Sequence, residues 1–263
     1  MGLFDKTKNG GPVLIGMIHC LPLPGTLGST YTIEQVVERA VSDAKVLEAA
    51  GFDAVMVENE DKCLAPHMSK LQFAGISMVA HAVRKAVSIP MGLCLGCLNY
   101  EEALSICKVV DAQFFRSPIF VDTVMNYNGI INPCSTQVIN YRKQIGAEHV
   151  KILADVQVKY YYMVNPDVSI MQSARWAERQ GADAVIVTGT ASGVETPLDD
   201  LQKVKKSISI PVVAGSGVTA ENMAQQREIA DVMIIGTTLR PGGKMSEPID
   251  PARAAAIVAA ARA

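Results

Sequence analysis

Residues 212–217, Val-Val-Ala-Gly-Ser-Gly, and residues 232–238, Val-Met-Ile-Ile-Gly-Thr-Thr, decide how this chain folds. Each segment is a short apolar, β-branched run that ends in a glycine-bearing turn, which is typical of a buried parallel strand entering a βα turn. Such turns expose backbone N–H groups that can bind an anion, although the glycines could instead only close tight turns. We expect a phosphate site here. The expected phosphate-binding residues are Gly215, Ser216, Gly217, Gly236 and Thr237.

Six similar apolar runs precede these two, and helical stretches alternate with them. The expected strands are residues 13–18, 54–57, 89–93, 113–116, 150–154, 184–187, 212–214 and 232–235. The expected helices are residues 33–50, 78–87, 101–110, 135–146, 169–180, 198–207 and 251–263. Strands this apolar need cover on both faces, so the sequence predicts an α/β fold, a single-domain (β/α)8 TIM barrel over residues 1–263. A doubly wound open sheet is the alternative, but no Gly-x-Gly-x-x-Gly follows the first strand.

Composition narrows the class of protein further. A length of 263 residues suits one barrel, and a formal net charge of −2 with scattered basic residues gives no reason to expect nucleic acid as a partner. The polar, glycine-rich segment 1–11 does not resemble a signal peptide, and no apolar run approaches the roughly 20 residues of a membrane span. We therefore expect a cytoplasmic protein whose partner is a small phosphorylated metabolite, with homo-oligomers an open possibility.

Polar residues gather just after the expected strands, where parallel barrels carry their chemistry. The expected catalytic residues are His19, Glu58 and Asp155, and the expected substrate-binding residues are Asn59, Arg116, Lys159 and Thr188. Alternation along an extended chain would aim Asp155, Gln157 and Lys159 at one side. In the competing interpretation, Glu58 and Arg116 form a structural ion pair and Lys159 lies in solvent.

The six cysteines are irregularly spaced, which is typical of reduced thiols rather than of a disulfide framework. Cys94 and Cys97 form a Cys-x-x-Cys motif, and neighbouring loops carry His19, Cys20, Cys63 and His67. Thiolates and imidazoles are zinc ligands, but a single such motif is a weak signal and cysteine is often a buried packing residue. We expect packing residues here, no metal site and no cofactor.

Eight segments form an ordered series over nearly the whole chain: residues 16–19, 22–25, 51–59, 150–156, 182–189, 215–222, 230–239 and 248–253. In sequence and in order, this series resembles the BtpA family, which includes the SgcQ proteins. The resemblance implies a barrel akin to the ribulose-phosphate-binding group. It leaves the activity open, although the family takes its name from a link to photosystem I biogenesis.

The chain departs from the family pattern at the barrel mouth. Residues 94–99 read Cys-Leu-Gly-Cys-Leu-Asn instead of Asn-Val-Leu-Arg-Asn-Asp. Residues 157–160 read Gln-Val-Lys-Tyr instead of His-Val-Lys-His, and residues 116–118 read Arg-Ser-Pro instead of Arg-Val-Asn. So many altered polar groups indicate a changed substrate or a weakened activity.

The expected function is that of an isomerase, lyase or aldolase-like enzyme acting on a sugar phosphate. His19 or Asp155 would move a proton while Glu58 and Arg116 orient the substrate. Lys159 could instead form a Schiff base, but a lysine in a loop is weak evidence for the low pKa that this role needs. The alternative function is that of a non-catalytic binding or assembly factor on a degenerate barrel.

Overall fold

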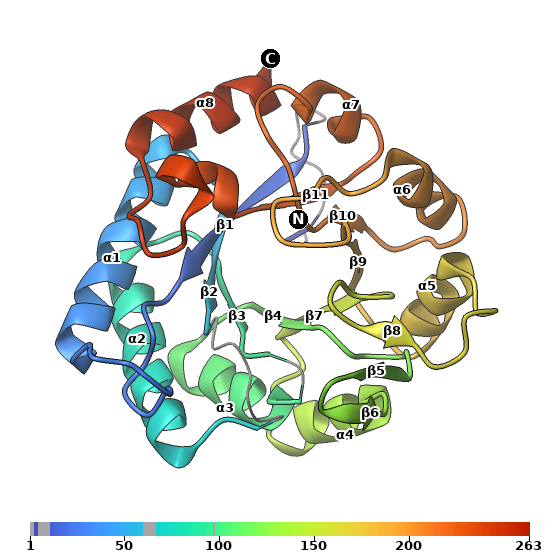
Figure 1. The fold of residues 1–263 in the computed structure, drawn as a ribbon, viewed down its shortest axis with the longest axis horizontal. Helices are drawn as coiled ribbons and strands as arrows, with labels where there is room; N and C mark the ends of the chain where they lie inside the picture. The colour runs from blue at the N-terminus through green and yellow to red at the C-terminus, as the bar shows by residue number, and fades with distance from the viewer. Residues whose placement is uncertain (1–2, 5–10, 60–66, 97) are drawn as a thin grey trace.

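The protein is a closed barrel of eight parallel strands. The computed structural model describes residues 3–4, 11–59, 67–96 and 98–263. Around the barrel the strands are β1 (Val13–His19), β2 (Ala54–Glu58), β3 (Met91–Cys94), β4 (Phe114–Ser117), β7 (Lys151–Asp155), β9 (Ala184–Val187), β10 (Val212–Ala214) and β11 (Val232–Ile235), which pairs with β1. Figure 1 looks down the barrel, with the strands at the centre and the helices in an outer ring. The predicted (β/α)8 TIM barrel is confirmed.

The helices alternate with these strands. They are α1 (Ile33–Ala50), α2 (Lys70–Ala86), α3 (Tyr100–Val110), α4 (Ser135–Gln144), α5 (Ile170–Arg179), α6 (Leu198–Lys205), α7 (Met223–Arg227) and α8 (Pro251–Arg262), with the short 3-10 helices η1 (Thr237–Leu239) and η2 (Pro241–Gly243) after β11. Helix α2 begins at Lys70 rather than at the expected residue 78, because Ser69 and Gln72 form a capping box there. Among the described residues, no helix combines the length and apolar character that a membrane crossing requires.

Alternate residues of each strand build two separate apolar clusters. In β1, Ile15 and Met17 point into the barrel, whereas Leu14 and Ile18 pack under the helices. The barrel interior is closed toward the N-terminal end by Phe4, whose ring meets that of Phe114 edge-on at 5.8 Å. Because the interior is a packed core, only the residues beyond the carboxyl ends of the strands remain for binding and chemistry.

A small antiparallel sheet, which the sequence interpretation missed, lies beside the barrel mouth. It consists of β5 (Val124–Asn126), β6 (Gly129–Ile131) and β8 (Tyr162–Met163), with β5 in the middle. The first two strands belong to the connection from β4 to α4, and β8 belongs to the connection from β7 to α5. The small sheet thereby ties together two loops that line one side of the mouth (Figure 1).

Candidate functional site

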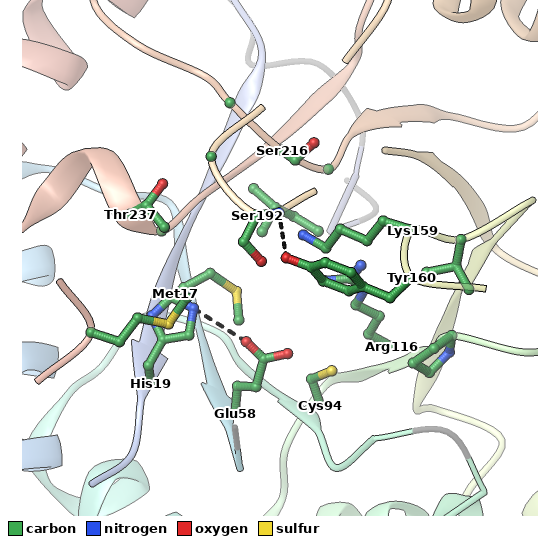
Figure 2. A pocket seen from close by; sticks show the side chains of 18 of the residues that line it. Met17, His19, Glu58, Cys94, Arg116, Lys159, Tyr160, Ser192, Ser216 and Thr237 are labelled. Atoms are coloured by element: carbon green, nitrogen blue, oxygen red, sulfur yellow. Dashed lines mark hydrogen bonds and ion pairs between the residues drawn. The ribbon is translucent and has the colours of Figure 1, made fainter. Parts of the chain in front are cut away.

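A cavity of about 540 Å³ opens at the carboxyl ends of the barrel strands, within the size range of small-molecule sites. The predicted residues that line it are His19, Glu58, Arg116, Lys159, Gly215, Ser216, Gly217, Gly236 and Thr237. Both predicted groups, the strand-end charges and the two glycine turns, thus face one cavity (Figure 2). Asn59, Asp155 and Thr188 are not part of its lining.

His19, Glu58 and Cys94 form one layer of the site because the barrel register places them side by side. In the ladders, His19 is opposite Glu58, and Glu58 is opposite Cys94. His19 Nε2 lies 3.2 Å from Glu58 Oε2. Burial raises the pKa of Glu58, but the hydrogen bond from His19 and the charges of His19 and Arg116 outweigh burial and lower it to about 2. Glu58 is therefore a carboxylate.

The other ring nitrogen of His19, Nδ1, is buried and has no hydrogen-bond partner among the described residues. The ring is packed against Gly236, where an added Cβ would lie only 2.8 Å from His19 Cε1. A glycine at position 236 is therefore required for the close approach of β11 to the histidine. The histidine is held between Glu58, which lies beside Nε2, and the backbone at Gly236, and its Nδ1 is buried.

Arg116 pairs with Asp155, and Glu58 pairs with His19, so the Glu58–Arg116 ion pair of the competing interpretation is not formed. Arg116 Nε and Nη2 donate to the two Asp155 oxygens at 2.7 and 2.8 Å, and both side chains are buried. Burial opposes the charge of Arg116, but the Asp155 carboxylate raises the pKa of the guanidinium above its ordinary value. Asp155 therefore reaches the cavity only through Arg116.

Lys159 lies in the cavity rather than in solvent, and Gln157 does not join it. The chain leaves the extended conformation after Asp155, because Gln157 has φ +47°. Its amide nitrogen Nε2 donates to the carbonyl of Val168 at 2.8 Å, away from the mouth. The expectation that Asp155, Gln157 and Lys159 share one side is therefore wrong for Gln157. The backbone N–H of Lys159 donates to Thr188 Oγ1 at 3.3 Å, which gives Thr188 a positioning contact.

The turn after β10 is shaped by the loop 189–196, which packs on it. Gly217 has φ +63°, and an added Cβ would lie 2.3 Å from the backbone nitrogen of Glu195. The hydroxyl of Ser216 accepts from the N–H of Gly189 at 2.6 Å and donates to the carbonyl of Val194 at 2.8 Å. The Ser216 side chain is thus occupied in holding this loop, and only its backbone remains for a ligand.

The backbone N–H groups of these turns are without partners. From Ser216 to Val218, and at Gly236 and Thr237, none donates a hydrogen bond to any residue that the structure describes. Gly217 and Val218 are also buried. Buried N–H groups without partners are rare in folded proteins. Several of them line one cavity, and exposed backbone N–H groups of this kind are typical donors to anions.

The cysteine prediction is tested only in part, because Cys63 and Cys97 lie outside the described residues. Cys94 is buried against Glu58, and burial followed by the Glu58 charge raises the pKa of its thiol well above the ordinary value. The thiol is therefore protonated. Within residues 3–4, 11–59, 67–96 and 98–263, no three histidine, cysteine or acidic side chains come together as a metal site.

Tyr160 and Ser192 are among the lining residues that were not anticipated. Tyr160 has φ +70°, and its hydroxyl oxygen accepts from the N–H of Ser192 at 2.7 Å (Figure 2). This contact joins the loop after β7 to the loop after β9 across the cavity. The run of three tyrosines at 160–162 was the available sequence signal, because amphipathic rings in a strand-end loop are typical of binding sites.

Proteins of similar sequence are known from archaea and cyanobacteria. A protein from Archaeoglobus fulgidus named only as uncharacterized is 36% identical over 250 residues, which cover 95% of this chain and 98% of that protein. "Photosystem I biogenesis protein BtpA" of Synechocystis is 29% identical over 263 residues, with 99% and 91% covered.

Among solved structures, the (S)-3-O-geranylgeranylglyceryl phosphate synthase of Thermoplasma acidophilum in complex with sn-glycerol-1-phosphate is similar in fold. Its TM-score is 0.64 at 15% identity, with 96% of this chain and 94% of that chain covered. The sequence profile of the BtpA family matches residues 11–263. The chain belongs to the BtpA family.

Proposed function

We propose that this barrel binds a small phosphorylated metabolite and acts on it by proton transfer, as an isomerase, lyase or aldolase-like enzyme. The observation that carries the proposal is the set of unpartnered backbone N–H groups at Ser216–Val218 and at Gly236 and Thr237, which line the same cavity as the strand-end charges. In parallel barrels the loops after the last two strands are a frequent phosphate site. The sn-glycerol-1-phosphate complex of the similar barrel supports this assignment by analogy of fold.

Lys159 adds a cation to the cavity in its ammonium form. Its side chain lines the cavity together with the two glycine turns, and no carboxylate of the described residues forms an ion pair with its ammonium group. Neutral N–H donors fix the geometry of a phosphate, and a nearby cation increases the affinity. Both kinds of group are present here without a competing protein anion at hydrogen-bond distance.

The proton-transfer part of the proposal rests on His19 and Glu58. His19 lines the cavity with its Nε2 beside an ionised carboxylate, an arrangement suited to proton transfer at Nε2. Arg116, fixed on both oxygens of Asp155, offers its remaining face to a substrate oxygen. We therefore assign His19 as the acid-base residue, Glu58 as its orienting partner, and Asp155 as a positioning residue for Arg116.

Ser192→Asp tests the anion site because Ser192 lines the cavity and points into it (Figure 2). The new carboxylate repels a phosphate and competes for Lys159. We expect at least tenfold weaker binding of sn-glycerol-1-phosphate by calorimetry, about 1.4 kcal/mol. Ser192→Asn is the matched control, because asparagine has nearly the shape of aspartate but no charge. This variant should bind sn-glycerol-1-phosphate with an affinity within about threefold of the wild type. Equal affinity of both variants and the wild type for this ligand would contradict the proposed anion site.

A non-catalytic role as a binding or assembly factor is the second candidate. The observation that favours it is the Synechocystis relative, named a photosystem I biogenesis protein, at 29% identity over 99% of this chain. In that case the cavity would bind its ligand without converting it. Incubation with triose phosphates, followed by NMR of the C–H protons in deuterated water, separates the two candidates, because acid-base chemistry by His19 exchanges those protons and simple binding does not.

A further inference from the structure

Lys159 is placed as a nucleophile would be. Its side chain enters the cavity from the loop after β7 (Figure 2), and its Nζ makes no hydrogen bond or ion pair with the residues that the structure describes. Lys151, at the start of β7, is by contrast paired, because its Nζ lies 2.8 Å from Asp183 Oδ1. A half-buried amine without a partner is not explained by a structural role.

The surroundings of Lys159 make its ammonium group easier to deprotonate than that of an exposed lysine. Burial lowers the pKa of Lys159, and the positive charge of Arg116 lowers it further, whereas Glu58, Asp155 and Tyr160 raise it without cancelling the shift. Asp155 is committed to Arg116 through two hydrogen bonds, and Glu58 is committed to His19. The two carboxylates that could hold the Lys159 proton are therefore engaged elsewhere, which leaves Nζ available for attack.

We propose that Lys159 forms a Schiff base with the carbonyl carbon of a phosphorylated aldehyde or ketone. The inference rests on the proposed function, because the turns after β10 and β11 would hold the phosphate end of the same molecule. The amine lone pair forms the C–N bond as the carbonyl π bond breaks. The oxygen then leaves as water, taking one proton from the amine and one from His19, and a protonated imine remains.

Reductive trapping tests this directly. Wild-type protein is incubated with dihydroxyacetone phosphate and sodium borohydride, whose hydride converts the imine to a stable secondary amine. We expect one reduced triose phosphate per chain by intact mass, located by peptide mapping on Lys159 at least tenfold more than on Lys151. Lys159→Arg, which keeps the charge but cannot form the imine, should lose this label, and Lys151→Arg should keep it. Labelling of Lys159 no greater than that of Lys151 would overturn the inference.

Two further arms separate this inference from the proposed function. Inorganic phosphate should suppress the Lys159 label, and unphosphorylated dihydroxyacetone should label Lys159 at least tenfold more slowly. Label that forms on Lys159 equally with both ketones and is insensitive to phosphate supports the nucleophile and contradicts the phosphate site. Phosphate binding measured by calorimetry without any label on Lys159 supports the phosphate site and contradicts the nucleophile.

Discussion

Replacing Glu58 with glutamine should lower the free energy of unfolding, by an amount that follows from the lowered pKa of Glu58. Glutamine keeps the shape of Glu58 but removes the charge that faces His19 and Arg116. Each tenfold change in an acid constant is worth about 1.4 kcal/mol, so lowering the pKa from its ordinary 4.5 to about 2 stabilises the fold by about 3 kcal/mol at neutral pH. The Glu58 side chain is only 18% exposed, so solvent screens this contribution weakly.

The sign of the pH dependence follows from the lowered pKa. A carboxyl whose folded pKa is depressed contributes its stability fully above the unfolded value of 4.5 and loses it as the pH falls toward about 2. The difference in the free energy of unfolding between wild type and Glu58→Gln should therefore fall from about 3 kcal/mol at pH 7 to about 1.5 kcal/mol at pH 3.

Urea unfolding at both pH values measures this difference. Asp199→Asn, at an exposed ion pair with Lys203, is the control and should change the free energy of unfolding by less than about 0.5 kcal/mol at pH 7. If the difference between wild type and Glu58→Gln is the same at pH 7 and pH 3, the electrostatic reasoning about His19, Glu58 and Arg116 is wrong.

Three other substitutions test the packing of the site by thermal or urea unfolding. Gly217→Ala should lower the free energy of unfolding by about 2 kcal/mol more than Gly28→Ala does. Both glycines have positive φ, but only Gly217 lacks room for a Cβ. Equal losses in the two variants would contradict the close approach of Glu195 to Gly217. Ser216→Ala should cost about 1–3 kcal/mol, because the Gly189 N–H loses its acceptor and the Val194 carbonyl loses a donor; an unchanged melting temperature would argue against this hydroxyl contact. Asp155→Asn should lower the free energy of unfolding by about 3 kcal/mol, because the buried Arg116 loses its charge partner and one of its two acceptors; a loss below about 1 kcal/mol would show that the pair is not essential.

The barrel and most of its mouth were predictable because they follow from strand periodicity. Strand ends in a closed parallel sheet meet at one edge, so His19 and Glu58 had to become neighbours once their strands were recognised. The same reasoning brought Arg116 and Lys159 to the cavity. The resemblance to the BtpA family rested on the order of the matching segments, and the family match over residues 11–263 confirms that resemblance.

The choice of ion-pair partners could not be read from the sequence. In the ladder Arg116 is opposite Leu153, yet its guanidinium reaches Asp155 two residues further along β7. That reach depends on strand tilt and side-chain length, which a residue pattern does not encode. The competing interpretation therefore paired Arg116 with Glu58, whereas the ion pair in the structure is with Asp155.

The small sheet and the glycine contacts were missed for different reasons. Strands of two or three residues, such as Tyr162–Met163, are too short to show a period. The packing of loop 189–196 on Gly217 is a contact between distant segments, so the sequence shows the glycine but not the backbone against it. Turn chemistry thus predicts a glycine at position 217 but does not reveal the backbone contact with Glu195 that requires it.

The most direct test of the account is the position of a phosphate in a crystal grown with sn-glycerol-1-phosphate. The account predicts phosphate oxygens within about 2.7–3.2 Å of the backbone nitrogens of Gly217 and Thr237, with the Lys159 ammonium on the same ligand. A phosphate bound elsewhere, or a cavity that stays without ligand at concentrations that saturate binding in solution, would contradict the central claim that the turns after β10 and β11 form an anion site.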